Sequence, residues 1–181
     1  MRASVYMAMS LDGFIARENG DLDWLPSSDD VAGEDHGYHA FMDTVDALVM
    51  GRATFEKVLS FGVGWPYQDK PVVVLSRSEY TLPPDLPDSV SVLGGSMTDI
   101  VAALLQRGFE HIYVDGGVTV QRFLRAGLVD RLILTIIPVV LGSGVPLFGA
   151  VDEDVRLTLA HHQCWPSGLV QLTYDVNVLN T

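Results

Sequence analysis

Cysteine and basic residues are scarce in this chain. Of its 181 residues only Cys164 is a cysteine, which excludes an internal disulfide and a cysteine-based metal site. Lysine and arginine together number 11 against 23 acidic residues, for a formal net charge of −12 at pH 7. A field of that sign repels nucleic-acid phosphates and anionic lipid. We therefore expect neither a nucleic-acid partner nor a membrane.

Long apolar runs are also missing. The stretch "ASVYMAM", residues 3–9, has the length of a buried strand and not that of a signal peptide or a membrane span. Hydrophobic residues make up 48% of the composition, which is enough for one sizeable core at this length. We expect a cytoplasmic protein with a single domain, residues 1–181.

Short apolar strands alternate with helical patterns along most of the chain. The run "PVVVLS" is continuous in the way that strands of buried parallel sheets are. This alternation predicts an α/β fold of three layers, with a mostly parallel central sheet, helices on both faces and a C-terminal antiparallel hairpin. We expect strands at 3–9, 46–50, 71–76, 89–93, 111–114 and 130–142, helices from 35 and at 53–60, 97–105 and 118–126, and a hairpin of 155–165 with 169–179.

Three of the expected strands end in residues that suit an anion. In an open α/β sheet, ligands bind outside the carboxyl ends of the strands. One strand runs into Gly51, Arg52, Ala53 and Thr54, another into Ser76-Arg77, and a third into Asp115-Gly116-Gly117. Helix N-termini, planar guanidinium groups and backbone without Cβ atoms all favour phosphate oxygens. Each feature also has an ordinary interpretation, as a solvated arginine or a simple turn.

Several segments resemble a known superfamily. The segment "VMGRATFEKV" is similar to the M-G-R-x-T-x-E segment of dihydrofolate reductases, and "VDGGVTVQRFL" is similar to their Gly-Gly segment. The start "VYMAMSLDGFIAREN" resembles their first strand and loop. The segment "AGLVDRLILTIIPVVLGSGVPLF" more closely resembles the reductase domain of the bifunctional riboflavin-biosynthesis deaminase–reductase and the stand-alone proteins related to it. The chain is identified as a member of the dihydrofolate-reductase-like superfamily.

The resemblance implies a cofactor, a site and an assembly. The cofactor would be NADPH and the assembly a homodimer, as in riboflavin-type relatives. Backbone groups of Ala8 and Ile15 would hold the nicotinamide carboxamide. Ser76 and Arg77 would reach the ribose and its 2′-phosphate. The remaining cofactor-binding residues would be Gly51, Arg52 and Thr54 at the phosphates, and Gly116, Gly117, Val118, Thr119 and Val120 around the pyrophosphate.

The proton donor is less well defined than the cofactor site. Asp35, shielded beside Tyr38 and Phe41, could have a raised pKa and act as the catalytic acid. Alternatively, Asp35 is a favourable charge in the first turn of a helix, and Asp29 or Asp30 supplies the proton. The long loop from residue 11 to residue 30 is a candidate lid. We expect no metal site.

These features predict an NADPH-dependent oxidoreductase that transfers a hydride to a small heterocyclic or carbonyl substrate. Phe14 stands where the riboflavin reductases typically carry a lysine near the substrate, so the substrate itself is left open. One alternative is a true dihydrofolate reductase, in which Asp35 would be essential. An alternative of another class is a non-enzymatic nucleotide-binding or redox-sensing module.

Overall fold

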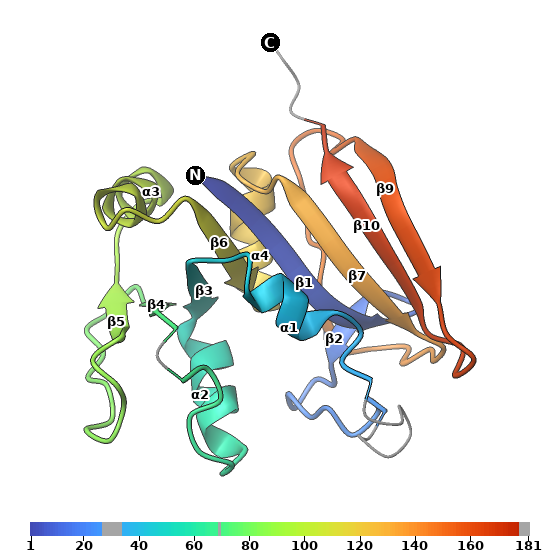
Figure 1. Cartoon of the computed structure of the whole chain (residues 1–181), viewed down its shortest axis with the longest axis horizontal. Coiled ribbons are helices and arrows are strands. Elements are labelled where there is room, and N and C mark those ends of the chain that lie inside the picture. Colours follow the sequence, from blue (N-terminus) through green and yellow to red (C-terminus); the bar gives the residue numbers. More distant parts are fainter. Residues whose placement is uncertain (27–33, 69, 178–181) are drawn as a thin grey trace.

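One large sheet organises the molecule. The computed structural model describes residues 1–26, 34–68 and 70–177. Within them, eight strands follow the order β5-β4-β3-β6-β1-β7-β10-β9, and β2 pairs with β8 in a small second sheet (Figure 1). The strands are β1 (Arg2–Ser10), β2 (Phe14–Ala16), β3 (Ala47–Gly51), β4 (Val72–Leu75), β5 (Val90–Leu93), β6 (His111–Asp115), β7 (Arg131–Ile137), β8 (Val145–Pro146), β9 (Leu157–Cys164) and β10 (Val170–Val176).

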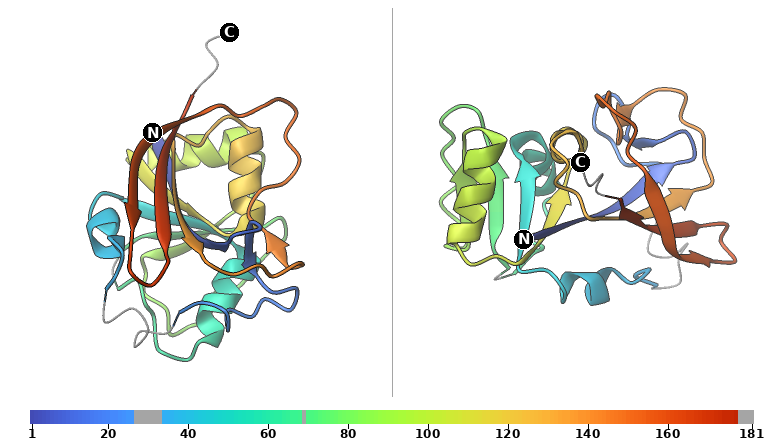
Figure 2. Two further views of the ribbon diagram at one scale, coloured as in Figure 1. Left: turned by 90° about the vertical axis from the view of Figure 1, so that its right-hand side faces the viewer. Right: turned by 90° about the horizontal axis from the view of Figure 1, so that it is seen from above.

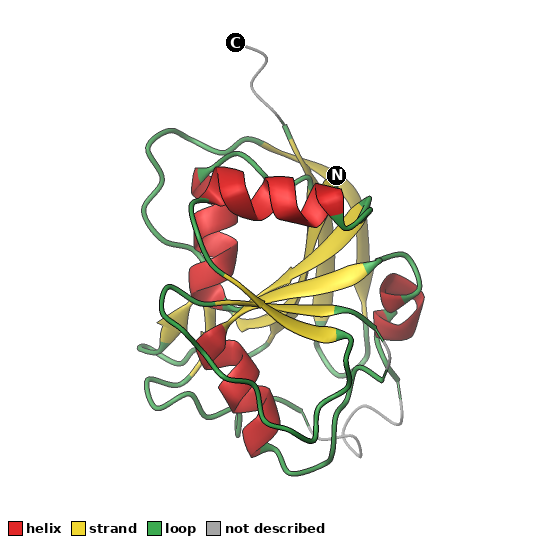
Figure 3. Ribbon diagram, turned by 90° about the vertical axis from the view of Figure 1, so that its left-hand side faces the viewer, coloured by secondary structure: helices red, strands yellow, loops and turns green. Residues whose placement is uncertain are grey.

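The sheet is mostly parallel, as expected. Strands β5, β4, β3, β6, β1 and β7 pair in parallel, whereas β10 runs antiparallel to β7 and β9 antiparallel to β10. Helices lie on both sides of it, so the predicted three-layer α/β class is confirmed (Figure 3). The helices are α1 (Tyr38–Met42), α2 (Arg52–Ser60), α3 (Met97–Gln106) and α4 (Gly117–Arg125). None of these helices is both long and apolar enough to cross a membrane.

The two faces of the sheet have different cores. Helices α3 and α4 cover one face with buried aliphatic residues and Phe123, which we call the aliphatic face. Helices α1 and α2 cover the other face, where Phe41 and Phe55 pack with Tyr113 of β6 and with further aromatic side chains. We call it the aromatic face. Accordingly, α1 and α4 lie on opposite sides of the sheet (Figure 2). Strand β6 serves both faces, since alternate side chains of a strand point to opposite sides.

Two element boundaries differ from the sequence-based prediction. The strand expected over 130–142 ends at Ile137, because Pro138 has no backbone N–H to continue the ladder. The chain then turns, and Val145–Pro146 pairs with a short strand in the expected loop after residue 10. The helix expected from Asp35 begins at Tyr38. Part of the candidate lid, including Asp29 and Asp30, lies outside the described residues.

Candidate active site

The predicted cofactor residues gather at the carboxyl edge of the sheet. Strands β3, β4 and β6 are parallel neighbours, with Gly51 opposite Leu75 and Met50 opposite Asp115. The residues that follow these strands therefore form one line. We call residues 51–54, 76–77 and 115–120 the ledge. Three separate stretches of the sequence meet there, as the strand-end argument predicted.

The glycines of the ledge bring two helix N-termini into contact. Gly116 has φ +86°, and a Cβ atom there would lie 2.1 Å from Oγ1 of Thr54. A Cβ atom on Gly51 would lie 3.0 Å from Oγ1 of Thr119. No side chain fits at Gly116 unless Thr54 moves. The start of α2 and the start of α4 therefore lie against each other.

The second glycine of the pair meets the loop sheet. A Cβ atom on Gly117 would lie 2.9 Å from the carbonyl oxygen of Pro146 in β8 and 3.2 Å from Cδ1 of Ile15 in β2. Gly117 thus joins the ledge to the β2–β8 pair, which holds a residue predicted to contact the nicotinamide. Close packing of protein atoms explains why neither Gly116 nor Gly117 has a side chain. The sequence alone did not reveal this reason.

The helices of the ledge begin without side-chain caps. Gly51 is the N-cap of α2 and Gly116 that of α4, and neither helix has a side-chain cap hydrogen bond. Helix α3, which follows β5 at the same edge of the sheet, has a complete capping box of Ser96 and Asp99. The first N–H groups of a helix need partners and carry a partial positive charge. Two adjacent uncapped starts have the chemistry that suits an anion with several oxygens, and the anion site at the ledge stays a prediction.

The two arginines of the ledge lie near the ring of Tyr80. The guanidinium of Arg52 bonds Glu56 at 2.7 Å and lies 4.4 Å from the ring centre of Tyr80. Ser76, Arg77 and Tyr80 line an open groove of about 480 Å³ beside β4 and β5. A flat ring of a ligand would stack here on Tyr80, and a phosphate group of the ligand would bind Arg77.

The other predicted cofactor residues differ in exposure. Ala8 lies in the second half of β1, whose carboxyl end meets the same edge as the ledge. The side chain of Val118 is 71% exposed, whereas Val120 is fully buried. Val120 therefore offers a ligand its backbone at most. The predicted assignment of these residues to the cofactor stays a prediction.

Asp35 does not have the environment expected of a catalytic acid. Its carboxylate accepts the backbone N–H groups of His39 and Gly37, both at 2.9 Å, and the ring of His39 at 2.6 Å. These bonds, the His39 and Gly37 N–H groups first, lower the pKa of Asp35 to about 2. The expectation of a raised pKa is wrong. The alternative interpretation fits these contacts: Asp35 is an exposed carboxylate that stabilises the first turn of a helix.

Asp115, which sequence reasoning did not assign to the site, has the raised pKa instead. It ends β6, directly before the glycine pair, and is half-buried. Burial raises the pKa of Asp115 to about 6, although the N–H of Gly116, which donates to its carboxylate at 2.7 Å, favours the ionised form. Burial raises the pKa values of Tyr38 and Tyr67 on the aromatic face, and the charge of Asp115 adds to this effect. The sequence did contain a signal for this residue, because an acidic residue directly follows a buried apolar run at the carboxyl edge of the sheet.

Asp12 fixes the loops beside the ledge. Its carboxylate accepts the N–H groups of Leu141 and Gly142, at 3.1 and 2.7 Å, and the hydroxyl of Ser10 at 2.6 Å. These bonds, the Ser10 hydroxyl first, lower the pKa of Asp12 to about 2. The carboxylate thus ties the loop after β1 to the loop after β7.

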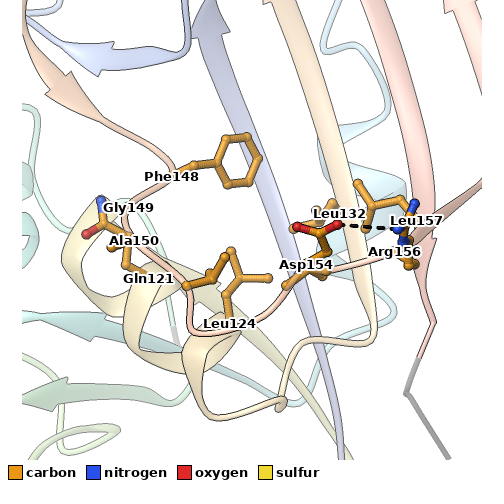
Figure 4. Close-up of a pocket in the computed structure, with 11 residues that line it drawn as sticks. Gln121, Leu124, Leu132, Phe148, Gly149, Ala150, Asp154, Arg156 and Leu157 are labelled. Carbon is orange, nitrogen blue, oxygen red and sulfur yellow. Dashed lines mark hydrogen bonds and ion pairs between the residues drawn. The ribbon is translucent and has the colours of Figure 1, made fainter.

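A second concave region lies away from the ledge. Leu124, Leu132, Phe148 and Leu157 are among the residues that line a groove of about 390 Å³ between α4, β7 and the segment before β9 (Figure 4). None of the predicted cofactor or catalytic residues lines it. Leu147 is fully buried, as expected of a packing residue, whereas Phe148 is 42% exposed and faces the groove.

Known proteins resemble the chain over most of its length. A model of the RibD C-terminal domain family matches residues 4–171. The uncharacterized protein YwjB of Bacillus subtilis (strain 168) is 39% identical over 162 residues, which are 86% of this chain and 87% of that protein.

Solved structures also match. A crystal structure of a Shewanella sp. PV-4 protein assigned to riboflavin biosynthesis has a TM-score of 0.90 at 41% identity, covering 98% of this chain and 99% of that one. Dihydrofolate reductase from Enterococcus faecalis, solved with NADP(H), has a TM-score of 0.66 at 21% identity, covering 97% and 96%. The latter is a likeness of fold.

Proposed function

This chain belongs to the RibD C-terminal domain family, and on that premise we propose that it is an NADPH-dependent reductase of a small heterocyclic or carbonyl substrate. The family and the Shewanella sp. structure support a reductase related to riboflavin biosynthesis. The choice of cofactor, the hydride transfer and the roles of individual residues are our proposals, and they rest on the ledge.

The observation that carries the proposal is the pair of uncapped helix starts. Helices α2 and α4 begin side by side at Gly51 and Gly116 with no side-chain cap, while α3 has one. Six N–H groups in the first turns of two helices, about three from each, suit a pyrophosphate better than a single phosphate. Dinucleotide cofactors carry that group.

The residues present fit NADPH along the line of the ledge. The pyrophosphate would lie against Gly116 and the start of α2, with the hydroxyl of Thr54 within reach. Arg77 would bind the 2′-phosphate at the groove that Tyr80 lines. Bound in this way, the cofactor supplies a hydride for reduction of the substrate. The chain itself holds the reactants together and excludes water.

We propose Asp115 as the group that holds the proton. A carboxyl with a pKa of about 6 is partly protonated at neutral pH, whereas Asp35 with a pKa of about 2 is not. Asp115 lies where β6 meets the glycine pair, so it is adjacent to the proposed cofactor site. It would donate a proton to the substrate directly or through one water molecule. The low pKa of Asp35 also weakens the alternative of a true dihydrofolate reductase.

We further propose that two copies pair through β9. All eight residues of this strand are exposed, including Leu157 and Leu159 at 39% and 49%, and within the described chain its outer edge pairs with no other strand. None of the eight is Lys, Arg, Asp or Glu, in a chain with a net charge of −12. An uncharged edge is where two such acidic chains can approach. Light scattering should give twice the chain mass, and Leu159→Lys should give a monomer.

The first test of the function is titration of the protein with NADPH and NADH, followed by tryptophan fluorescence. We expect NADPH to bind more tightly. Arg77→Ala should weaken NADPH binding about tenfold and change NADH binding less than about twofold, since NADH has no 2′-phosphate. Arg107→Ala is the matched control, because Arg107 follows the last residue of α3, is exposed and bonds Ser91. Equal losses for both cofactors would remove the 2′-phosphate assignment, and no binding of either would remove the proposed function.

A further inference from the structure

Tyr80 lies outside the strand-end segments that form the ledge, yet its ring contacts one of the ledge arginines. We propose that Tyr80 is a positioning residue. It holds the guanidinium of Arg52 in the orientation that binds the pyrophosphate of the cofactor, and Glu56 completes the arrangement. This role rests on the proposed function, because the ligand of Arg52 is the proposed cofactor.

The pairing of β3 with β4 places Tyr80 beside the start of α2. Gly51, at the end of β3, lies opposite Leu75, at the end of β4, so the chain leaves both strands at the same level. After β4 the chain turns back, and the ring of Tyr80 meets the ring of Phe55 on α2 edge to face, with 6.0 Å between ring centres. Phe55 is fully buried in the aromatic face. The half-buried ring of Tyr80 is therefore held by the core itself.

Two contacts from different parts of the chain fix the guanidinium of Arg52. Its Cζ atom lies 4.4 Å from the ring centre of Tyr80, which is within the range of a cation–π contact. Its Nε donates to Oε1 of Glu56 at 2.7 Å, one turn further along α2. A planar group that is stacked on a ring and bonded at Nε keeps a defined orientation. The Nη groups of Arg52 have no hydrogen-bond partner within residues 1–26, 34–68 and 70–177, so they remain available to a phosphate.

The orientation matters because Arg52 lies close to solvent. Its side chain is 46% exposed and that of Glu56 is 45% exposed, and an ion pair in such a position fixes its geometry only weakly. A flexible side chain that becomes ordered only when the ligand binds weakens affinity by about threefold to tenfold. The contact with Tyr80 orders Arg52 before the cofactor arrives, which removes part of this loss.

Glu56 also divides the work between the two arginines. Its carboxylate offsets much of the charge of Arg52, which therefore acts through the direction of its N–H groups. Arg77 is exposed in the groove and forms no ion pair with any other described residue. On the proposed function Arg77 binds the 2′-phosphate, whereas Arg52 binds the pyrophosphate that NADPH and NADH share. A change at Tyr80 should then affect both cofactors equally.

The test is a double-mutant cycle of Tyr80→Leu and Arg52→Ala, with NADH binding measured by tryptophan fluorescence. Leucine still offers a ligand ring an apolar surface, but it offers a cation no electron-rich face. We expect Tyr80→Leu to weaken NADH binding about fivefold in the wild-type chain and less than about twofold in the Arg52→Ala chain. NADPH should show the same factors. No loss, equal losses with and without Arg52, or a loss for NADPH alone would overturn the proposal.

Two further variants separate the stacked contact from a general loss of packing. Tyr80→Phe keeps the face of the ring and should bind NADH within about twofold of the wild type. Tyr174→Leu removes a half-buried ring from the aliphatic face, where no cation stacks on it in the described chain, and should leave NADH affinity unchanged. A loss in Tyr80→Phe as large as that in Tyr80→Leu, or a similar loss in Tyr174→Leu, would contradict the role of the ring. If Tyr80→Leu does not fold, Tyr80→Met takes its place in the cycle, because methionine adapts to irregular space.

Inorganic pyrophosphate distinguishes this inference from the proposed function. It carries the group assigned to Arg52 and has no nucleoside, so the same cycle can be measured with it by calorimetry. If the chain binds pyrophosphate with the expected coupling of Tyr80 to Arg52 but binds neither cofactor, the role of Tyr80 stands and the proposed function falls. If the chain binds neither the cofactors nor pyrophosphate, both are overturned.

Discussion

The two faces of the sheet use the same strands in opposite ways. Strand β6 sends Ile112 and Val114 to the aliphatic face, where both are fully buried. It sends Tyr113 and Asp115 to the aromatic face, where a hydroxyl and a carboxyl need partners. The aliphatic face gains stability from burial alone. The aromatic face holds polar groups that a chain selected for stability alone would avoid. Functional sites commonly hold such groups.

Hydrogen bonds offset part of that cost on the aromatic face. The Tyr113 hydroxyl donates to the carbonyl oxygen of Tyr6 at 2.8 Å, and the Tyr6 hydroxyl donates to that of His36 at 2.8 Å. Gln171 from β10 also donates to the Tyr6 hydroxyl, at 3.2 Å. This network connects β1, β6, β10 and the loop before α1. The face nearest the proposed substrate is therefore held by directional contacts and not by close packing only.

The largest expected effect tests the aliphatic face as the source of stability. Phe123 on α4 is fully buried there, so Phe123→Ala should lower the free energy of unfolding by about 3–5 kcal/mol. Chemical denaturation would measure it. Val118→Ala on the same helix is the control, because its side chain is 71% exposed and should change stability by less than about 0.5 kcal/mol. Similar losses in both variants would contradict the division between the two faces.

The next effect concerns the contact between the two ledge helices. Gly116→Ala adds a methyl group 2.1 Å from Oγ1 of Thr54 at a φ of +86°, so it should lower stability by about 2–4 kcal/mol and abolish NADPH binding. Gly127→Ala, at φ +65° with open space around its Cβ position, should cost only about 1 kcal/mol. Thr54→Ala should recover part of the Gly116→Ala loss. If the two substitutions lower stability by the same amount, the loss at Gly116 comes from backbone strain at positive φ and not from the contact with Thr54.

Asp115→Asn should act in opposite directions on stability and activity. Folding raises the pKa of Asp115 from its ordinary value of about 4 to about 6, so the folded state binds more protons between these values. Wild-type stability therefore falls as pH rises from 4 to 6, and the ionised carboxylate is unfavourable above pH 6. No lysine or arginine lowers the pKa of Asp115 to offset this.

The variant should then be more stable than the wild type by about 1–2 kcal/mol at pH 7 and equal to it at about pH 4. This stability difference is smaller than the free energy that corresponds to the whole pKa shift, because the half-buried side chain of Asp115 is partly screened by solvent. Reductase activity should fall by about tenfold or more, with the pH dependence near 6 removed. Melting curves at several pH values would measure the first effect. A stability difference that does not change with pH would contradict the raised pKa.

The positions of the ledge residues could be predicted from the sequence, whereas their contacts could not. Apolar runs ending in Gly51, Ser76 and Gly116 were enough to predict three strand ends on one edge. The fit of Gly116 against Thr54 depends on two segments far apart in the chain, and strand patterns do not specify such a distance. For the same reason the burial of Asp115, which raises its pKa, could not be predicted from the strand pattern.

Asp35 shows the opposite case, in which local sequence was sufficient. An acid three residues before a helix is common because it accepts N–H groups of the first turn, and the structure has that arrangement with Gly37 and His39. The interpretation as a raised-pKa acid required shielding by Tyr38 and Phe41, which point into the aromatic core instead. Local hydrogen bonds are decided by neighbours in the sequence, and a pKa is decided by the whole environment.

The smallest expected effect separates capping from ligand binding. Ser96 caps α3, where its hydroxyl accepts the N–H of Asp99 at 3.2 Å, so Ser96→Ala should lower stability by about 1 kcal/mol and leave NADPH affinity unchanged. Helices α2 and α4 have no cap to remove. On our proposal the cofactor takes that role, so saturating NADPH should raise the melting temperature of Ser96→Ala and of the wild type by the same amount. A smaller shift in the variant would mean that α3 also contributes to the cofactor site.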